Sequence, residues 1–388
     1  MVIHGAGCAL LDVLYAGADF AGPAFTAVMS RRDGDGGLRP GSLVFSEDLE
    51  AFAGRDYPRI LADLTAGCGP ASYTVGGPSV VSLIHAAQML HGSGHTVRFY
   101  GALGSDEAAS RMAACLERIP SLRTKLTIKA GSTARTDVLS DRRHENGQGE
   151  RTFIHLPGSA SLLSPEELGE DFFDARITAF GGTALLPRLH DGLTGLLRKA
   201  RQRGAATVVN LVYDYRSDSG GRKWKLGARD DAYPFIDALL CDTDEALKTA
   251  GAARAEDAAR WFLSRGTGAV VVTRGAKPAL LASAGGLFAP LGLSELPVSQ
   301  SIAAALAGGA GQGDTTGCGD NFTGGFLAAL AERLGSGGQA DLRETCIPAV
   351  VAGGFACFTL GGVFYERRAG EKRELLAPYL ASYRAPPA

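Results

Sequence analysis

The chain has 388 residues, of which 45% are hydrophobic, and its formal net charge is −2. This composition is sufficient for a large core, and the length is compatible with several domains or with one large α/β domain. The near-neutral charge, with no run of basic residues longer than a pair, argues against an extended nucleic-acid surface.

The N-terminal segment MVIHGAGCALLDVLY lacks a basic stretch followed by an apolar one, so we do not expect a signal peptide. The sequence contains no uncharged apolar run long enough to span a membrane. Its seven cysteines are scattered and form no CxxC pair, which favours a reducing compartment over a disulfide framework or a structural zinc site. We therefore expect a cytoplasmic protein.

Short apolar runs alternate with longer helical patterns along most of the chain. Strands that are apolar throughout are typical of a parallel sheet covered by helices on both faces. The sequence therefore predicts a doubly wound α/β fold with a mostly parallel sheet, whose ligands bind beyond the carboxyl ends of the strands. The expected strands are residues 2–8, 97–103, 176–182, 206–212, 237–241 and 269–275.

Two regions, residues 13–60 and 124–156, interrupt this alternation. They contain polar, turn-rich segments such as SRRDGDGG, and runs such as KLTIKAG and RTDVLSD that alternate as half-exposed strands do. A small β-structured lid that projects from the sheet fits this pattern, and an irregular surface loop is the alternative.

The segment GDTTGCGDNFTGGF, residues 313–326, places glycines and carboxylates directly before an apolar helical run. It lacks the lysine of a Walker A loop. Gly317, Cys318 and Gly319 can direct three backbone N–H groups toward one point at the positive end of a helix dipole, where an anion is favoured. Asp320 stands beside that point and can accept a hydroxyl proton, as phosphoryl transfer to an alcohol requires. The alternative is a glycine-rich helix start that Asp320 caps.

DTTGCGD, residues 314–320, resembles the D-T-x-G-[AC]-G-D signature of the ribokinase, or PfkB-type, carbohydrate kinases. Other segments resemble this family in the same order along most of the chain. The resemblance implies a single ribokinase-like domain over residues 1–388, with a small lid formed by parts of 13–60 and 124–156. The further segments are GCALLDVL (7–14), TVGGPSVVSLIHAAQML (74–90), FYGALGSDEAASRM (99–112), GERTFIHLPGSAS (149–161) and VVVTRGAKPALL (270–281).

The resemblance implies an ATP-dependent kinase that requires Mg²⁺. Asp320 would be the catalytic base, and the amides of Gly317, Cys318 and Gly319 would form the anion hole. A stretch at 350–360 would close one side of the adenine pocket. The residues implied to bind the nucleotide are Thr273, Gly275, Asp314, Thr315 and Thr316.

The resemblance also implies three further binding roles. Asp314 and Thr315 lie where the family often binds a monovalent cation such as K⁺. Glu245 and Asp242 would act on Mg²⁺ through water, with Asp242 in place of the family's usual Asn. The acceptor would be bound by Asp12, Gly76 and Gly77.

The sequence departs from the family on the acceptor side. Val81 stands where the family has a sugar-binding Asn, and a valine cannot hydrogen-bond to hydroxyl groups. Pro278 replaces the last glycine of the T-x-G-x-x-G pattern near the nucleotide. The base and the anion hole therefore match the family, and the acceptor contacts do not.

One cysteine and two arginines each have two interpretations. A cysteine at a helix N-terminus can be reactive, but the family takes Ala or Cys at this position, and Cys318 is interpreted as a small residue. Arg135 and Arg151 can steer a phosphate through their forked donors, or they can lie on a solvated face of the lid.

The leading hypothesis is phosphorylation of a hydroxymethyl group on a sugar or sugar-like substrate. A nucleoside kinase of the same family is an alternative, because Val81 suits an apolar base. A non-catalytic ligand-binding or regulatory protein on the same fold is a third. We expect a small-molecule partner, no nucleic acid and no membrane, and by analogy with the family a homodimer through the lid.

Overall fold

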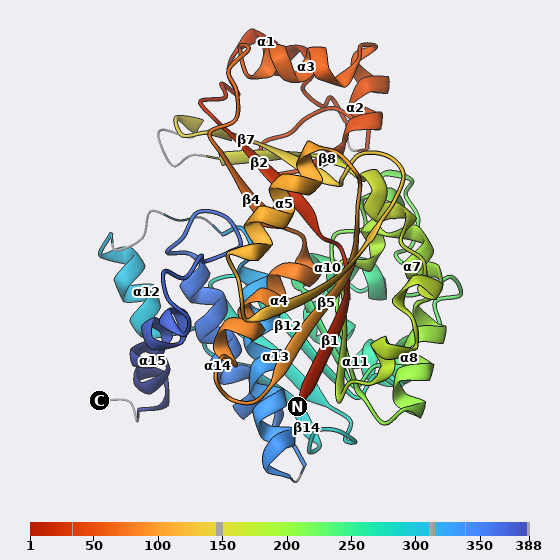
Figure 1. Ribbon diagram of the computed structural model, residues 1–388, viewed down its shortest axis with the longest axis vertical. Coiled ribbons are helices and arrows are strands. Elements are labelled where there is room, and N and C mark those ends of the chain that lie inside the picture. Colours follow the sequence, from red (N-terminus) through yellow and green to blue (C-terminus); the bar gives the residue numbers. More distant parts are fainter. Residues whose placement is uncertain (33, 145–149, 310–312, 314, 338, 386–388) are drawn as a thin grey trace.

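The computed structural model describes residues 1–32, 34–144, 150–309, 313, 315–337 and 339–385. In this part of the chain the strands form a large sheet with the order β14-β13-β12-β11-β10-β9-β1-β5-β6 (Figure 1). All neighbours are parallel except β13 with β12 and β14 with β13. The strands are β1 (Val2–Gly7), β5 (Thr96–Leu103), β6 (Leu122–Ile128), β9 (Ile177–Gly181), β10 (Ala206–Asn210), β11 (Ala238–Asp242), β12 (Ala269–Arg274), β13 (Lys277–Ser283) and β14 (Leu291–Leu296).

The strands of this sheet are apolar because both of its faces are buried. In β12, Val270 and Val272 belong to one apolar core and Val271 belongs to another on the opposite face, and all three are 0% exposed. Side chains alternate between the two faces of a strand, so a strand inside a covered sheet shows no polar alternation. Each of the six predicted strands overlaps an observed one, and the predicted doubly wound α/β fold is confirmed.

Helices cover both faces of the large sheet (Figure 1). On one face α13 packs between α4 and α14, and α15 lies against α14. Gly324 and Gly325 permit this close packing, because a Cβ there would lie 2.4 Å from the Ser82 carbonyl oxygen and 2.9 Å from the Cα of Ala349. None of the described helices is both long and apolar enough to cross a membrane. The helices are α4 (Pro78–Met89), α5 (Glu107–Glu117), α7 (Pro187–Asp191), α8 (Leu193–Gln202), α9 (Tyr215–Ser219), α10 (Thr243–Ala250), α11 (Ala255–Ser264), α12 (Gln300–Ala307), α13 (Cys318–Ser336), α14 (Leu342–Ala356) and α15 (Glu371–Arg384).

A second, smaller sheet with the order β3-β8-β7-β2-β4 lies at one end of the large sheet, at the top of Figure 1. Three helices cover it, with Phe25, Leu49 and Ile60 packed into the same apolar core as Leu139 and Ile154 of the sheet. The elements are β2 (Leu10–Ala16), β3 (Leu43–Phe45), β4 (Ser72–Gly76), β7 (Arg135–Asp141), β8 (Glu150–Leu156), α1 (Pro23–Ala27), α2 (Ser46–Ala53) and α3 (Tyr57–Leu64).

The small sheet differs in two respects from the β-structured region expected at 13–60 and 124–156. The regular structure within residues 23–64 is mainly helical, and its helices are five to eight residues long, too short to show a helical period in the sequence. The run KLTIKAG belongs largely to β6, which pairs with β5 at the edge of the large sheet. Its polar residues reflect an edge strand that is mostly exposed or half-buried, and not a strand of the small sheet.

Candidate active site

The large sheet has its topological switch point at β1. The chain proceeds from β1 to β5 and β6 on one side, and through β9, β10, β11 and β12 on the other. Crevices at such points bind ligands at the carboxyl ends of the strands. β1 ends at Gly7, which is paired with Gly181 of β9, and the chain then enters β2 of the small sheet. Asp12 is therefore carried by the strand that leaves this crevice.

The N-terminus of α13 is built around Gly317. This residue is the N-cap, with a left-handed φ of +74°, and a Cβ on it would lie 2.4 Å from the Cα of Gly362. Only glycine fits such a conformation and such a close approach. The N–H of Cys318 donates to the Thr315 carbonyl oxygen at 3.3 Å, so it can contact an anion only if this long bond opens or is shared. Because Gly317 is the cap, Asp320 in the first turn does not cap the helix.

The side chain of Asn321 ties this loop to the rest of the molecule. Its Nδ2 donates to the carbonyl oxygens of Gly317 and Gly362, at 2.8 Å each. Its Oδ1 accepts from Lys372 Nζ at 2.8 Å and lies 3.0 Å from His85 Nδ1. Lys372 comes from α15, is 2% exposed, and burial lowers the pKa of its ammonium group to about 7. The sequence analysis identified neither Asn321 nor Lys372.

Three carboxylates lie near one another at the carboxyl end of the sheet. Asp320 is half-buried, and loss of solvation raises its pKa to about 7. The pKa of Glu245 is raised to about 8, mainly by burial and further by the negative charges of Asp242 and Asp320. A cation beside these groups would offset their repulsion.

Asp242 and Glu245 also form a capping box at the start of α10. Asp242 Oδ1 accepts from the Glu245 N–H at 2.8 Å, and Glu245 Oε2 accepts from the Asp242 N–H at 2.9 Å. Among the described residues no group of three or more histidine, cysteine or carboxylate side chains converges closely enough to hold a metal ion by itself.

A cavity of about 330 Å³ brings together most of the residues expected to contact the nucleotide. Thr273 and Gly275, at the end of β12, form one side, and Thr315 lies at the entrance of α13. Asp314 lies outside the described residues. The expected stretch 350–360 also contributes residues to the cavity wall. The cavity is also lined by Cys318, Gly319, Phe322, Val350, Gly353, Gly354 and Cys357.

Among the expected acceptor residues, Asp12 of β2 lies beside Gly76 of β4, and Gly77 follows as the N-cap of α4. A Cβ on Gly76 would lie 2.1 Å from Asp12 Oδ2, so the absence of a side chain there makes room for the carboxylate. Burial raises the pKa of the Cys8 thiol, and the negative charges of Asp12 and Asp320 raise it further, so both carboxylates are within electrostatic range of Cys8. Val81 is 2% exposed and packs toward Gly362, so it presents no surface to an acceptor.

The two arginines expected near the lid, Arg135 and Arg151, both lie on the small sheet and have different surroundings. Arg151 of β8 donates from Nη1 to Thr316 Oγ1 at 2.9 Å, and so joins the small sheet to the loop before α13. Arg135 of β7 pairs with the buried carboxylate of Asp137 at 3.0 Å. Arg151 is thus the arginine that reaches the candidate site.

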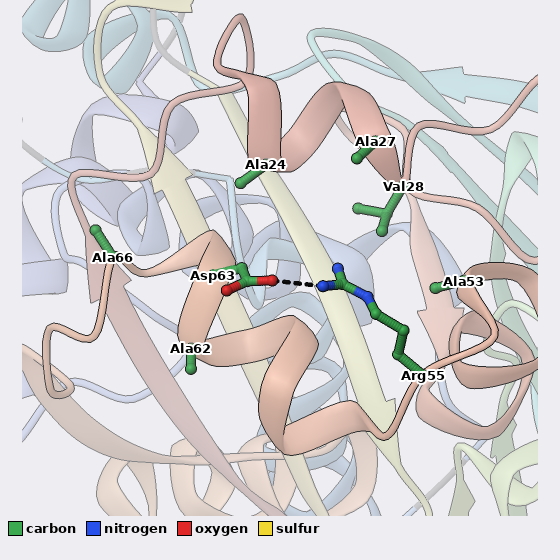
Figure 2. A pocket seen from close by; sticks show the side chains of 8 residues that line it. All are labelled: Ala24, Ala27, Val28, Ala53, Arg55, Ala62, Asp63 and Ala66. Carbon is green, nitrogen blue, oxygen red and sulfur yellow. Dashed lines mark hydrogen bonds and ion pairs between the residues drawn. The ribbon is translucent and has the colours of Figure 1, made fainter.

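A second hollow, of about 630 Å³, lies over the helices of the small sheet (Figure 2). Its charged side chains, Arg55 and Asp63, pair with each other at 2.6 Å. The remaining lining is small and apolar, so the hollow offers no group for acid–base or nucleophilic chemistry. Those residues are Ala24, Ala27, Val28, Ala53, Ala62 and Ala66.

The crevice, the glycine-lined helix start and the nearby carboxylates together define a site of the phosphotransferase class. The chain belongs to the PfkB family of carbohydrate kinases, whose model, described as pfkB family carbohydrate kinase, matches residues 71–365. No curated protein matches the sequence.

Solved structures with the same fold include nucleoside and sugar kinases. Adenosine kinase from Schistosoma mansoni in complex with 2-fluoroadenosine has a TM-score of 0.71 and 16% identity, and the match covers 94% of this chain and 97% of that one. Adenosine kinase from Anopheles gambiae in complex with P1,P4-di(adenosine-5) tetraphosphate has a TM-score of 0.65 and 17% identity, with coverage of 100% and 98%. A probable sugar kinase from Rhizobium etli CFN 42 has a TM-score of 0.67 and 18% identity, with coverage of 97% and 98%.

Proposed function

We propose that this kinase transfers the γ-phosphoryl group of ATP to a hydroxymethyl group of a sugar or sugar-like substrate. The observation that carries the proposal is the position of Asp320. It lies in the first turn of α13, next to residues of the 330 Å³ cavity, and its charge and that of Asp12 both act on Cys8. In the proposed complex this carboxylate faces the nucleotide in the cavity on one side and the acceptor at Asp12 on the other.

Asp320 is the proposed base. A pKa of about 7 leaves its carboxylate largely ionised at slightly alkaline pH and basic enough to accept the hydroxyl proton as the phosphoryl group is transferred. The amides of Gly317, Cys318 and Gly319, at the positive end of the α13 dipole, stabilise the charge on the phosphoryl oxygens.

Binding of the nucleotide is assigned to the residues around the cavity. Mg²⁺, when bound, neutralises phosphate charge, and Asp242 and Glu245 would hold its water ligands with the oxygens that the capping box leaves available. Asp314 and Thr315 are the proposed contacts of a monovalent cation. Thr273 and Gly275 line the cavity, and Thr316 lies in the loop before α13, where it accepts from Arg151.

The small sheet is proposed to act as a lid over the acceptor. Asp12 accepts a hydrogen bond from an acceptor hydroxyl, and Gly76 and Gly77 let the sugar approach the backbone. Arg151 bonds to Thr316 from the small sheet. A lid held against the loop in this way excludes water, which would otherwise compete as the phosphoryl acceptor.

A nucleoside is the second candidate acceptor. Adenosine kinases from several organisms share the fold, and some of these structures contain adenosine or an analogue. A nucleoside carries the same hydroxymethyl group on its ribose, so Asp320 and the anion hole would perform the same chemistry on either substrate.

A panel of sugars, sugar phosphates and nucleosides, assayed for ADP formation with ATP and Mg²⁺, identifies the acceptor. In the same assay Asp320→Asn should lower kcat by about 100- to 10,000-fold, the usual contribution of a general base, while ATP affinity is retained. Asp257→Asn, which changes an exposed carboxylate on α11, is the matched control. Activity of Asp320→Asn near the wild-type value would refute the assignment. Tight binding of a compound without turnover would instead favour a ligand-binding protein.

A further inference from the structure

Two cysteine side chains contact each other in the wall of the nucleotide cavity. Cys318 is the first residue of α13, and Cys357 caps the C-terminus of α14. Their Sγ atoms are 3.4 Å apart, and both residues line the cavity. A disulfide requires an S–S distance of about 2.05 Å, so the two sulfur atoms would have to approach by roughly 1.4 Å.

The environment of this pair differs from that of the other described cysteines. Cys8, Cys241 and Cys346 are buried, and burial raises the pKa of each thiol, which keeps it in the unreactive protonated form. Cys318 is half-buried on a cavity wall, at the end of a helix whose dipole favours a thiolate. Cys68 is exposed and Cys115 is half-buried, but neither lines the cavity. Accessibility, thiolate stabilisation and a neighbouring thiol therefore coincide at Cys318.

We propose that Cys318 and Cys357 form a reversible oxidation site. A hydroperoxide, such as hydrogen peroxide, converts the two thiols to a disulfide, and this disulfide inhibits the reaction of ATP bound in the nucleotide cavity. The Cys318 thiolate attacks an oxygen of hydrogen peroxide and the O–O bond breaks, which gives a sulfenic acid and a hydroxide ion that takes up the proton lost by the thiol and becomes water. The Cys357 thiol then displaces the hydroxyl group as a second water, and the disulfide forms. Two thiols lose two electrons and two protons in total, and one peroxide is reduced to two waters.

The disulfide would disturb the residues around the anion hole. Cys318 carries one of its amides, and its carbonyl oxygen lies 3.1 Å from the position of a Cβ on Gly353 in α14. Gly313, before the loop, packs more tightly still, because a Cβ on it would lie 2.2 Å from the Cys357 carbonyl oxygen. With so little space, drawing the sulfur atoms together displaces the start of α13 relative to α14. Displacement of a positioned active-site group by about 1 Å can reduce the rate by about 100-fold.

The test treats the full-length, pre-reduced protein with hydrogen peroxide, blocks the remaining thiols by alkylation, and maps peptides by mass spectrometry. We expect a peptide that joins residues 318 and 357 with the loss of two hydrogens. We also expect kcat/KM for ATP to fall by about 100-fold and to recover with dithiothreitol. ATP with Mg²⁺ should slow formation of the cross-link, because the thiols line the cavity that the nucleotide occupies.

Two variants separate this site from general oxidation, each compared with its own untreated sample. Cys357→Ser should lose the reversible inactivation, and Cys68→Ser should retain it. The proposal is overturned if peroxide modifies Cys68 without forming the 318–357 cross-link, if the cross-link leaves ATP turnover unchanged, or if Cys357→Ser is reversibly inactivated like the wild type. The effect on turnover rests on the proposed kinase function. If no acceptor supports turnover, the cross-link and its protection by ATP remain measurable, so the two failures are distinguishable.

Discussion

Replacement of Asn321 by alanine tests how the anion-hole loop is held in place. Asn321 makes hydrogen bonds to the carbonyl oxygens of Gly317 and Gly362 and to Lys372 Nζ, each 2.8 Å long. At about 1 kcal/mol each, their loss should lower the free energy of unfolding by about 3 kcal/mol. Lys372 would also lose its acceptor while buried, which adds about 1–3 kcal/mol. We therefore expect a total loss of about 4–6 kcal/mol from denaturant titrations.

The same variant should be impaired in catalysis under conditions in which it is folded. Without Asn321 the carbonyl of Gly317 loses its side-chain donor, and the amides that follow it are no longer fixed. We expect kcat to fall by about 100-fold, the order of loss that a displaced active-site group causes. The KM for the acceptor should change little, because Asp12 is not part of this network. Steady-state kinetics with both substrates varied separates the two effects.

Lys372→Met is the matched comparison. Methionine removes one hydrogen bond and the cost of burying an ammonium group, and leaves the bonds from Asn321 Nδ2 to Gly317 and Gly362 in place. Replacement of a buried charge by an apolar side chain of similar size is often neutral or stabilising. The variant should therefore stay as stable as the wild type and keep kcat within about tenfold, because the loop keeps both of its bonds. Unchanged stability and kcat in Asn321→Ala would refute this account of the loop.

Three further predictions concern the reaction. Because Asp320 acts ionised and has a pKa of about 7, kcat/KM should be level at higher pH and fall about tenfold per unit below about pH 7; a profile that is flat through this range would contradict its role. Gly76→Ala should raise the KM for the acceptor by about tenfold or more, since its Cβ would lie 2.1 Å from Asp12 Oδ2. Gly69→Ala, whose Cβ would meet nothing within 4 Å, is the control, and equal KM values in the two variants would count against the acceptor assignment. Arg151→Ala removes the bond from the lid to the loop before α13 and should lower kcat by about tenfold; an unchanged kcat would show that this bond is dispensable.

The large sheet and the start of α13 could be predicted because their physical causes are local in the sequence. A strand covered on both faces must be apolar throughout, as Val270 and Val271 are, and this pattern is visible without knowledge of its neighbours. The turn at Gly317 requires glycine for its own backbone conformation. Both the buried strand and the glycine turn are therefore determined by the residues of one short segment.

The features that the sequence analysis missed depend on distant contacts. Lys372 lies in a segment that reads as a polar helix, and only tertiary packing places its Nζ on Asn321, 51 residues earlier in the chain. It also lies beyond residue 365, where the family match ends, so the resemblance gave no indication of it. The helices over residues 23–64 are stabilised by packing on the small sheet, because helices this short have little stability of their own.

The structure also changes the interpretation of Val81. In the sequence the valine is the main departure on the acceptor side and favours an apolar base. In the structure it is buried and packs toward Gly362, which itself lies against Gly317 at the start of α13. The side chain at position 81 therefore packs toward the backbone that supports Gly317. It has no exposed surface with which to contact an acceptor. Asp12 is then the one charged group among the expected acceptor residues, and a single carboxylate recognises hydroxyl groups that sugars and nucleosides share. Discrimination between the two must come from residues that contact the rest of the acceptor, outside the motif that identifies the family.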